Sequence, residues 1–168
     1  MDIISHGLWG AGAFGRKSKK NFWMAFLFGV MPDLLSFGVF TFATFVGLAK
    51  RPDWSAGPPD ATSIPEYVHI LYDLTHSFIV FAVVFALIWI ILRRPYYLIL
   101  GWPLHILFDI GTHSAEFFPT PFLWPFVEYR FNGISWAEPS IFIPNILFLA
   151  LLYGGWGIWK FIESRRKN

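Results

Sequence analysis

Long apolar stretches, separated by short polar or basic ones, dominate the chain. Those at residues 22–49, 68–92 and 139–160 are long enough for a membrane-spanning helix, which needs about 20 predominantly apolar residues. A fourth apolar stretch covers about 95–111, and residues 1–15 are too few to cross a bilayer. The pattern predicts an all-α protein: an integral membrane helical bundle of about four transmembrane helices plus a short N-terminal helix, forming one domain over residues 1–168.

Composition strengthens the membrane assignment and narrows the chemistry. Hydrophobic residues make up 55% of the chain and charged residues only 14%, against about 25% charged in ordinary soluble proteins. The chain has no cysteine, which excludes disulfides, thiolate metal sites and a cysteine nucleophile. The net charge is only +2, and without a broad basic face nucleic acid is not an expected partner. The expected partner is the lipid bilayer.

Basic residues gather at three places, residues 16–20, 93–94 and 165–167. Cytoplasmic loops of membrane proteins carry an excess of lysine and arginine. We therefore expect the three clusters, and with them the N- and C-termini, on the cytoplasmic side of the cytoplasmic (inner) membrane. The loops at 50–66 and 112–138 then face outward.

A line of polar residues crosses the apolar stretch near residue 105. His105, Asp109 and His113 follow one another at steps of four, which puts them on one face of a helix. Two imidazoles and a carboxylate are ordinary ligands for a divalent metal. The alternative is a helix-packing stripe stabilised by hydrogen bonds.

Two other apolar stretches carry similar residues. His69, Asp73 and His76 are spaced i, i+4 and i+7 at the start of the 68–92 stretch, again one helix face. Pro32 and Asp33 interrupt the 22–49 stretch, and a carboxylate at this depth costs about 2.5–3.5 kcal/mol on insertion scales. Asp33 could be a ligand, or it could cap a second half-helix after a proline kink; both can hold at once.

Depth along the predicted helices favours the metal site over structural packing. At a rise of 1.5 Å per residue, the polar positions lie roughly 15–25 Å from the basic clusters, so four separate segments bring them to one layer. The predicted ligands are His6, Asp33, His76, His105 and Asp109. The expected cofactor is one or two divalent metal ions, with zinc as the first choice. His113 and Glu116 are expected at the outer mouth, where they could bind substrate or a second ion.

Several short motifs, in this order, resemble the YdjM-like inner-membrane metal-dependent hydrolase family: SHGLWG near the start, MPDLL, LTHS at 74–77, HILFDIGTH and LWPF. The resemblance implies a helical membrane domain with the same five metal ligands. The chain departs from the family pattern at one place. Many relatives have His-Arg-Gly just before Thr-His-Ser, and here those positions hold Leu71, Tyr72 and Asp73. His69 or Asp73 could replace the function of that His-Arg-Gly run.

The function we expect is hydrolysis of a lipid or lipid-linked (phospho)ester by a metal-activated water. Asp73 is a candidate general base, or could orient His69 or His76. The lipidic substrate is an inference from the depth of the site. Lines of histidine and aspartate also conduct protons, so an ion or proton transporter is one alternative, and a non-catalytic metal-binding membrane protein is another.

Overall fold

The computed structural model describes residues 1–53, 55 and 57–166. Residues 54, 56, 167 and 168 lie outside it, and with them part of the 50–66 loop and the last residue of the 165–167 cluster. The described ranges are helical and contain no strand, so the all-α prediction is confirmed. The helices are α1 (Ile3–Phe14), α2 (Lys19–Asp33), α3 (Val39–Phe45), α4 (Glu66–Thr75), α5 (Phe78–Leu92), α6 (Gly101–Thr112) and α7 (Pro139–Arg166), with a π-helix at Leu34–Gly38 and 3₁₀ turns at Ala61–Ser63 and Tyr97–Leu100.

Two helical stretches are long and apolar enough to cross a membrane. Lys19–Phe45 has 27 residues and α7 has 28, about 40 Å each at the helical rise, against a hydrocarbon core of about 30 Å. Helices α4 and α5 make a third if the bent pair is one span, and Tyr97–Thr112 is too short. The described chain thus has two or three candidate spans, fewer than the four predicted, because one apolar stretch is bent and another is cut short.

The bend lies between α4 and α5, which meet at 61°. Ser77 causes it locally: its hydroxyl accepts hydrogen bonds from the amides of Ile79 and Val80 and so starts a new helix. His76 therefore lies just past the end of α4, with φ −105° and ψ 21°. The amide of His76 still donates to the carbonyl of Tyr72 at 2.9 Å, so His69, Asp73 and His76 keep their helical spacing. The continuous helix expected over 68–92 ends here.

The stretch around Pro32 changes helix type without breaking. Helix α2 passes into the π-helix, whose first turn has the hydroxyl of Ser36 donating to the carbonyl of Pro32 at 2.9 Å. The Asp33 side chain makes no capping hydrogen bond, so the capping alternative is wrong. π-turns inside α-helices are often found at functional sites, and this one leaves the Asp33 carboxylate free to serve elsewhere.

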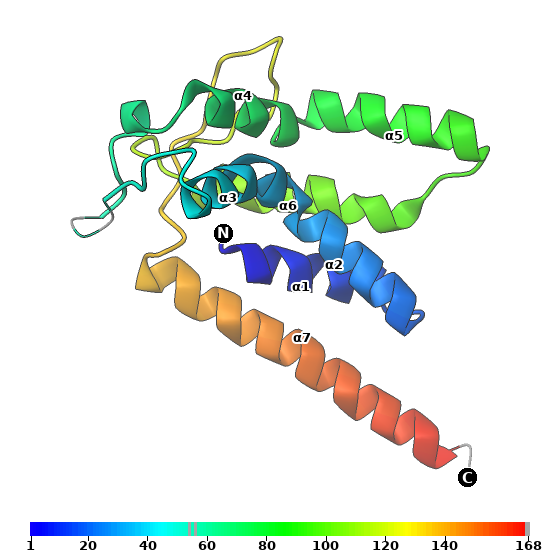
Figure 1. Cartoon of the computed structure of the whole chain (residues 1–168). Helices are drawn as coiled ribbons and strands as arrows, with labels where there is room; N and C mark the ends of the chain where they lie inside the picture. The colour runs from blue at the N-terminus through cyan, green and yellow to red at the C-terminus, as the bar shows by residue number, and fades with distance from the viewer. Residues whose placement is uncertain (54, 56, 167–168) are drawn as a thin grey trace.

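Figure 1 shows how the elements are arranged. The turn between α1 and α2, the turn after α5 and the C-terminus lie toward the right of the view, and the loops around residues 46–65 and 113–138 lie toward the left. The basic clusters and the two long loops therefore occupy opposite ends of the molecule. Helix α7 runs along the outside of the other helices (Figure 1). Only 11% of its most apolar 18-residue stretch is buried, as expected of a helix that faces lipid.

Helices α1, α2 and α6 pack closely enough for backbone to touch backbone. A Cβ atom on Gly29 of α2 would lie 2.5 Å from the carbonyl oxygen of His6, and one on Gly10 of α1 would lie 2.7 Å from that of Ala25. Small residues allow such an approach between membrane helices. The contact carries His6 into the middle of the molecule.

Candidate metal centre

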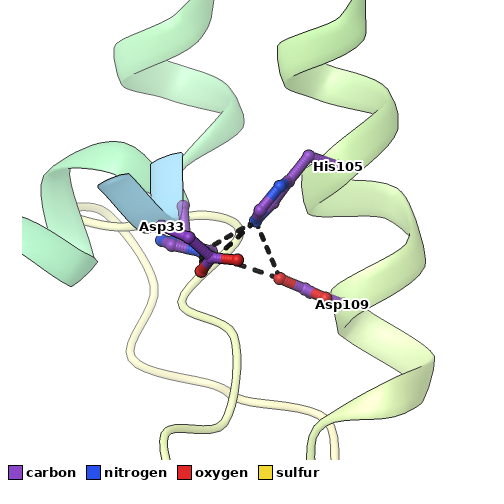
Figure 2. Close-up of side chains that lie close together, drawn as sticks. Asp33, His105 and Asp109 are labelled. Carbon is purple, nitrogen blue, oxygen red and sulfur yellow. Dashed lines mark hydrogen bonds and ion pairs between the residues drawn. The ribbon is translucent and has the colours of Figure 1, made fainter. Parts of the chain in front are cut away.

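Four side chains from three segments converge at the centre of the helical packing. Asp33 ends α2, His76 follows α4, and His105 and Asp109 lie one turn apart on α6. One ligand atom from each lies within 4.8 Å of the others. Figure 2 shows Asp33 approaching from one side and the two α6 residues from the other. We call Asp33, His76, His105 and Asp109 the four-donor cluster.

The spacing of these donors fits a small divalent ion. His105 Nε2 lies 3.1 Å from His76 Nε2 and 3.0 Å from Asp109 Oδ2. His76 Nε2 lies 3.6 Å from Asp109 Oδ2. Asp33 Oδ1 lies 3.5 Å from His76 Nε2 and 3.8 Å from His105 Nε2. Four ligands at 2.0–2.1 Å in a tetrahedron would stand about 3.4 Å apart, so the cluster has the size of a zinc site.

Backbone carbonyls orient both imidazoles of the cluster. His105 Nδ1 lies 2.7 Å from the carbonyl oxygen of Gly29, and His76 Nδ1 lies 3.1 Å from that of Tyr72. A carbonyl can only accept, so each Nδ1 carries a proton, and a ring that is neutral turns the lone pair of its Nε2 inward. With both rings neutral, the two Nε2 lone pairs 3.1 Å apart would repel unless a cation lay between them. A hydrogen bond from Nδ1 to a backbone carbonyl is typical of metal-binding histidines.

Burial makes a counter-charge necessary. The side chains of His76, His105 and Asp109 are fully buried and that of Asp33 is 18% exposed. Asp109 Oδ2 has no hydrogen-bond partner among the described residues. Two carboxylates largely removed from solvent cost free energy unless positive charge compensates them. The Met1 ammonium, 2.5 Å from Asp109 Oδ1, supplies one positive charge, and a divalent cation would supply two more. The residues present therefore fit a divalent metal ion.

The other predicted ligand, His6, joins the same group from α1. Its ring stacks on His105 with centroids 3.6 Å apart, and its Nε2 lies 2.9 Å from Asp109 Oδ1, the oxygen opposite the four-donor cluster. His113, predicted for the outer mouth, also reaches this oxygen: its Nε2 lies 3.5 Å away and its side chain is only 12% exposed. The structure thus brings all five predicted ligands together and places His113 beside them.

The remaining predicted site residues have other partners. His69 Nε2 lies 3.0 Å from the carbonyl oxygen of Ala61, and the ring stacks on Phe118. Asp73 accepts a hydrogen bond from Arg130 at 2.9 Å. Glu116 is exposed on the loop after α6. The structure does not bring these three into the four-donor cluster, and Tyr72, rather than Asp73, orients His76.

Residues that the sequence reasoning missed hold the centre in place. The ring of Tyr72 stacks on His76 at 3.8 Å, and its hydroxyl donates to the carbonyl of Phe118 at 2.8 Å. Trp102 donates from Nε1 to the carbonyl of Thr75 at 2.6 Å, which fixes the end of α4 against α6. One signal was present in the sequence: Gly29 lies four residues before Asp33 and so shares its helix face.

The loop after α6 is bonded to the start of α5 and to His113. Ser77 donates to the carbonyl of Trp124 at 2.5 Å, and the amide of Phe78 donates to that of Phe122 at 3.0 Å. Farther along, the amide of Gly133 donates to the carbonyl of His113 at 2.9 Å. These bonds join residues far apart in the sequence, so periodicity alone could not predict them.

Comparisons with protein-family models, with curated proteins and with solved structures find no match to this chain.

Proposed function

We propose that the protein is a membrane-embedded, metal-dependent hydrolase acting on a lipid or lipid-linked (phospho)ester, related to the YdjM-like family that its motifs resemble. One observation carries the proposal: two Nε2 atoms with inward lone pairs and two carboxylates converge at the spacing of a tetrahedral ion. Histidines bind a metal ion in the neutral form, and with both rings neutral this cluster sets acceptors against acceptors, whereas a structural stripe of hydrogen bonds would pair donors with acceptors.

The chemistry follows from what such a centre can hold. A bound divalent ion, zinc as the first choice, lowers the pKa of a water molecule toward about 7 and stabilises negative charge on a phosphoryl or carbonyl oxygen. The chain's part is to hold the ligands rigidly, through the carbonyls of Gly29 and Tyr72, and to exclude bulk water. Asp73 remains our candidate for a general base, and Arg130 sets the position of its carboxylate.

Placement in the membrane supports a lipidic substrate. The long apolar stretches Lys19–Phe45 and α7 would span the bilayer, with the bent α4–α5 pair and the shorter α6 completing a bundle around the centre. We place the basic end of the molecule, including the Arg16 end of α1 and the C-terminal end of α7, in the cytoplasm of a cell with an inner membrane. Met1 itself is buried beside Asp109.

The topology has a direct test. Because the chain lacks cysteine, a single cysteine can be introduced without background. In membrane vesicles of known orientation, Ser18→Cys should react with a membrane-impermeant maleimide only from the cytoplasmic side, and Ser55→Cys only from the outer side. Labelling of both positions from one side would contradict the proposed orientation.

The activity test uses purified protein with a panel of lipid phosphoesters and carboxylic esters beside water-soluble analogues. We expect turnover of lipidic forms only, lost on chelation and restored by Zn²⁺. Asp33→Asn should lower turnover by more than about 100-fold, since removal of residues that only orient a ligand costs 10–100-fold. Asp60→Asn is the matched control, because this exposed carboxylate bonds only within its own loop turn.

Three outcomes would contradict the hydrolase. Chelator-resistant turnover would exclude the metal-based mechanism. Metal-dependent ion flux in proteoliposomes, without turnover on any substrate, would instead favour a transporter. Stoichiometric metal binding with neither turnover nor flux would indicate a non-catalytic metal-binding protein.

A further inference from the structure

The carboxylate of Asp109 faces different partners with its two oxygens. Oδ2 belongs to the four-donor cluster, with His105 Nε2 at 3.0 Å and His76 Nε2 at 3.6 Å. Oδ1 faces away from that cluster, toward His6 Nε2 at 2.9 Å and His113 Nε2 at 3.5 Å. A carboxylate with nitrogen ligands gathered at both oxygens has the form of a bridge between two cations.

Both ring nitrogens of His6 are buried and unsatisfied. Its side chain is fully buried, and neither ring nitrogen makes a hydrogen bond to the described residues. Nε2 nevertheless lies 2.9 Å from Asp109 Oδ1, so the two atoms are close without the alignment of a hydrogen bond. Buried polar atoms of this kind are rare in native proteins and call for an explanation such as an ion.

His113 is oriented in the same way as the ligands of the first site. Its Nδ1 lies 3.0 Å from the carbonyl oxygen of Phe118, so Nδ1 carries the proton and the neutral ring turns the lone pair of Nε2 toward Asp109. Tyr72 donates to the same carbonyl and thereby helps to hold it. A histidine ring held through a backbone carbonyl, with its free nitrogen facing a carboxylate, matches His76 and His105.

Positive charge already lies against this oxygen. The ammonium group of Met1 lies 2.5 Å from Asp109 Oδ1 and 2.9 Å from the hydroxyl of Thr112. A metal ion bound at this oxygen would have to displace this ammonium group. Occupation by this ammonium alone is the alternative that the experiment must separate from a metal ion.

We propose that a second divalent cation binds at the Oδ1 side of Asp109, held by His6 and His113, with Asp109 bridging it to the ion in the four-donor cluster. The proposal rests on the proposed function for that first ion. Pairs of metal ions about 3.5–4 Å apart are a recurrent arrangement in phosphatases and nucleases, where they clamp the attacking and leaving oxygens of a displacement at phosphorus.

The second ion also narrows the substrate class. Asp33 and Asp109 bring two negative charges. Once the Met1 ammonium is displaced, two divalent ions leave two positive charges in a buried site, and an anionic substrate would neutralise them. The substrate class is therefore a phosphoester with a lipid tail, in preference to an uncharged carboxylic ester.

Metal content tests the proposal without reference to activity. Full-length protein purified in detergent, loaded with Zn²⁺ and desalted, should contain two ions per chain by elemental analysis. His113→Ala and His6→Ala should each contain one. Glu116→Ala is the control, because this exposed carboxylate three residues beyond His113 should leave two ions bound. After loading with Mn²⁺, the wild type should show the spin-coupled electron paramagnetic resonance signal of a bridged pair, and His113→Ala should show an isolated ion.

The results separate this proposal from the proposed function. One ion in the wild type, unchanged in His113→Ala, would mean that the Met1 ammonium alone occupies the Oδ1 side; the second site would be refuted and the hydrolase would stand. No bound ion at all would refute both. If His6→Ala does not fold, the metal content of the wild type and of His113→Ala still tests the second site. His113 is 12% exposed, so its replacement should disturb folding less. Turnover of lipid carboxylic esters in preference to lipid phosphoesters would refute the substrate class.

Discussion

Replacing Asp109 by asparagine should leave the protein without bound divalent metal and without hydrolytic turnover. One Asp109 oxygen belongs to the four-donor cluster and the other faces His6 and His113. Asparagine keeps the shape of the side chain but removes its charge and replaces one oxygen by an amide nitrogen, which is not a ligand. We expect turnover to fall by more than about 100-fold, beyond the effect of losing a residue that only orients a ligand.

The matched control is Asp73→Asn. It removes one carboxylate charge from the neighbouring helix, but that carboxylate pairs with Arg130 at 2.9 Å and lies outside the four-donor cluster. The Asp73 variant should therefore keep its metal, as measured by elemental analysis of the folded protein. Full metal occupancy in a folded Asp109→Asn variant would instead show that the polar cluster only packs the helices.

Replacing Gly29 by alanine should destabilise the fold and disturb the metal centre together. The added Cβ would meet the carbonyl oxygen of His6 at 2.5 Å, so α1 and α2 must separate. Overpacking of this kind typically costs about 1–3 kcal/mol. The Gly29 carbonyl also accepts from His105, so the shift would turn that imidazole, and metal affinity should fall with stability.

Thermal unfolding in detergent, with and without bound metal, measures both effects. Gly154→Ala is the control, because a Cβ there has nothing within 4 Å and α7 is largely exposed. The control should unfold within a few degrees of the wild type and bind metal fully. A Gly29→Ala variant with unchanged stability and unchanged metal content would mean that the close contact between α1 and α2 does not position His6.

Local periodicity was sufficient where ligands share one helix. His105 and Asp109 are four residues apart, and an α-helix of almost any tilt stacks such positions; the structure has them on α6 as predicted. The same reasoning did not predict that the helix ends at His76, because it assumed that the helix continued through Ser77. A serine can start a helix as well as lie within one, and the choice depends on whether its carbonyl and hydroxyl partners, here on the distant loop at Trp124, are in reach.

The number of membrane spans also depends on contacts between segments that are distant in the sequence. Hydropathy measures how many apolar residues follow one another, and by that measure four segments qualified. It does not register a 61° bend between α4 and α5 or a segment that is helical only over Tyr97–Thr112. These depend on contacts with other segments, such as the bond from Trp102 to the carbonyl of Thr75.

By itself the sequence determined the helical class, the apolar stretches 22–49 and 139–160 that overlap the candidate spans, and which residue types could be ligands. These properties follow from local composition and from periods of three to four residues. Only the tertiary structure decided that the Gly29 and Tyr72 carbonyls set the imidazoles and that Asp109 turns one oxygen to each side. The physical reason is that hydrogen bonds and close helix contacts join residues far apart in the chain, and their geometry exists only once the helices have packed.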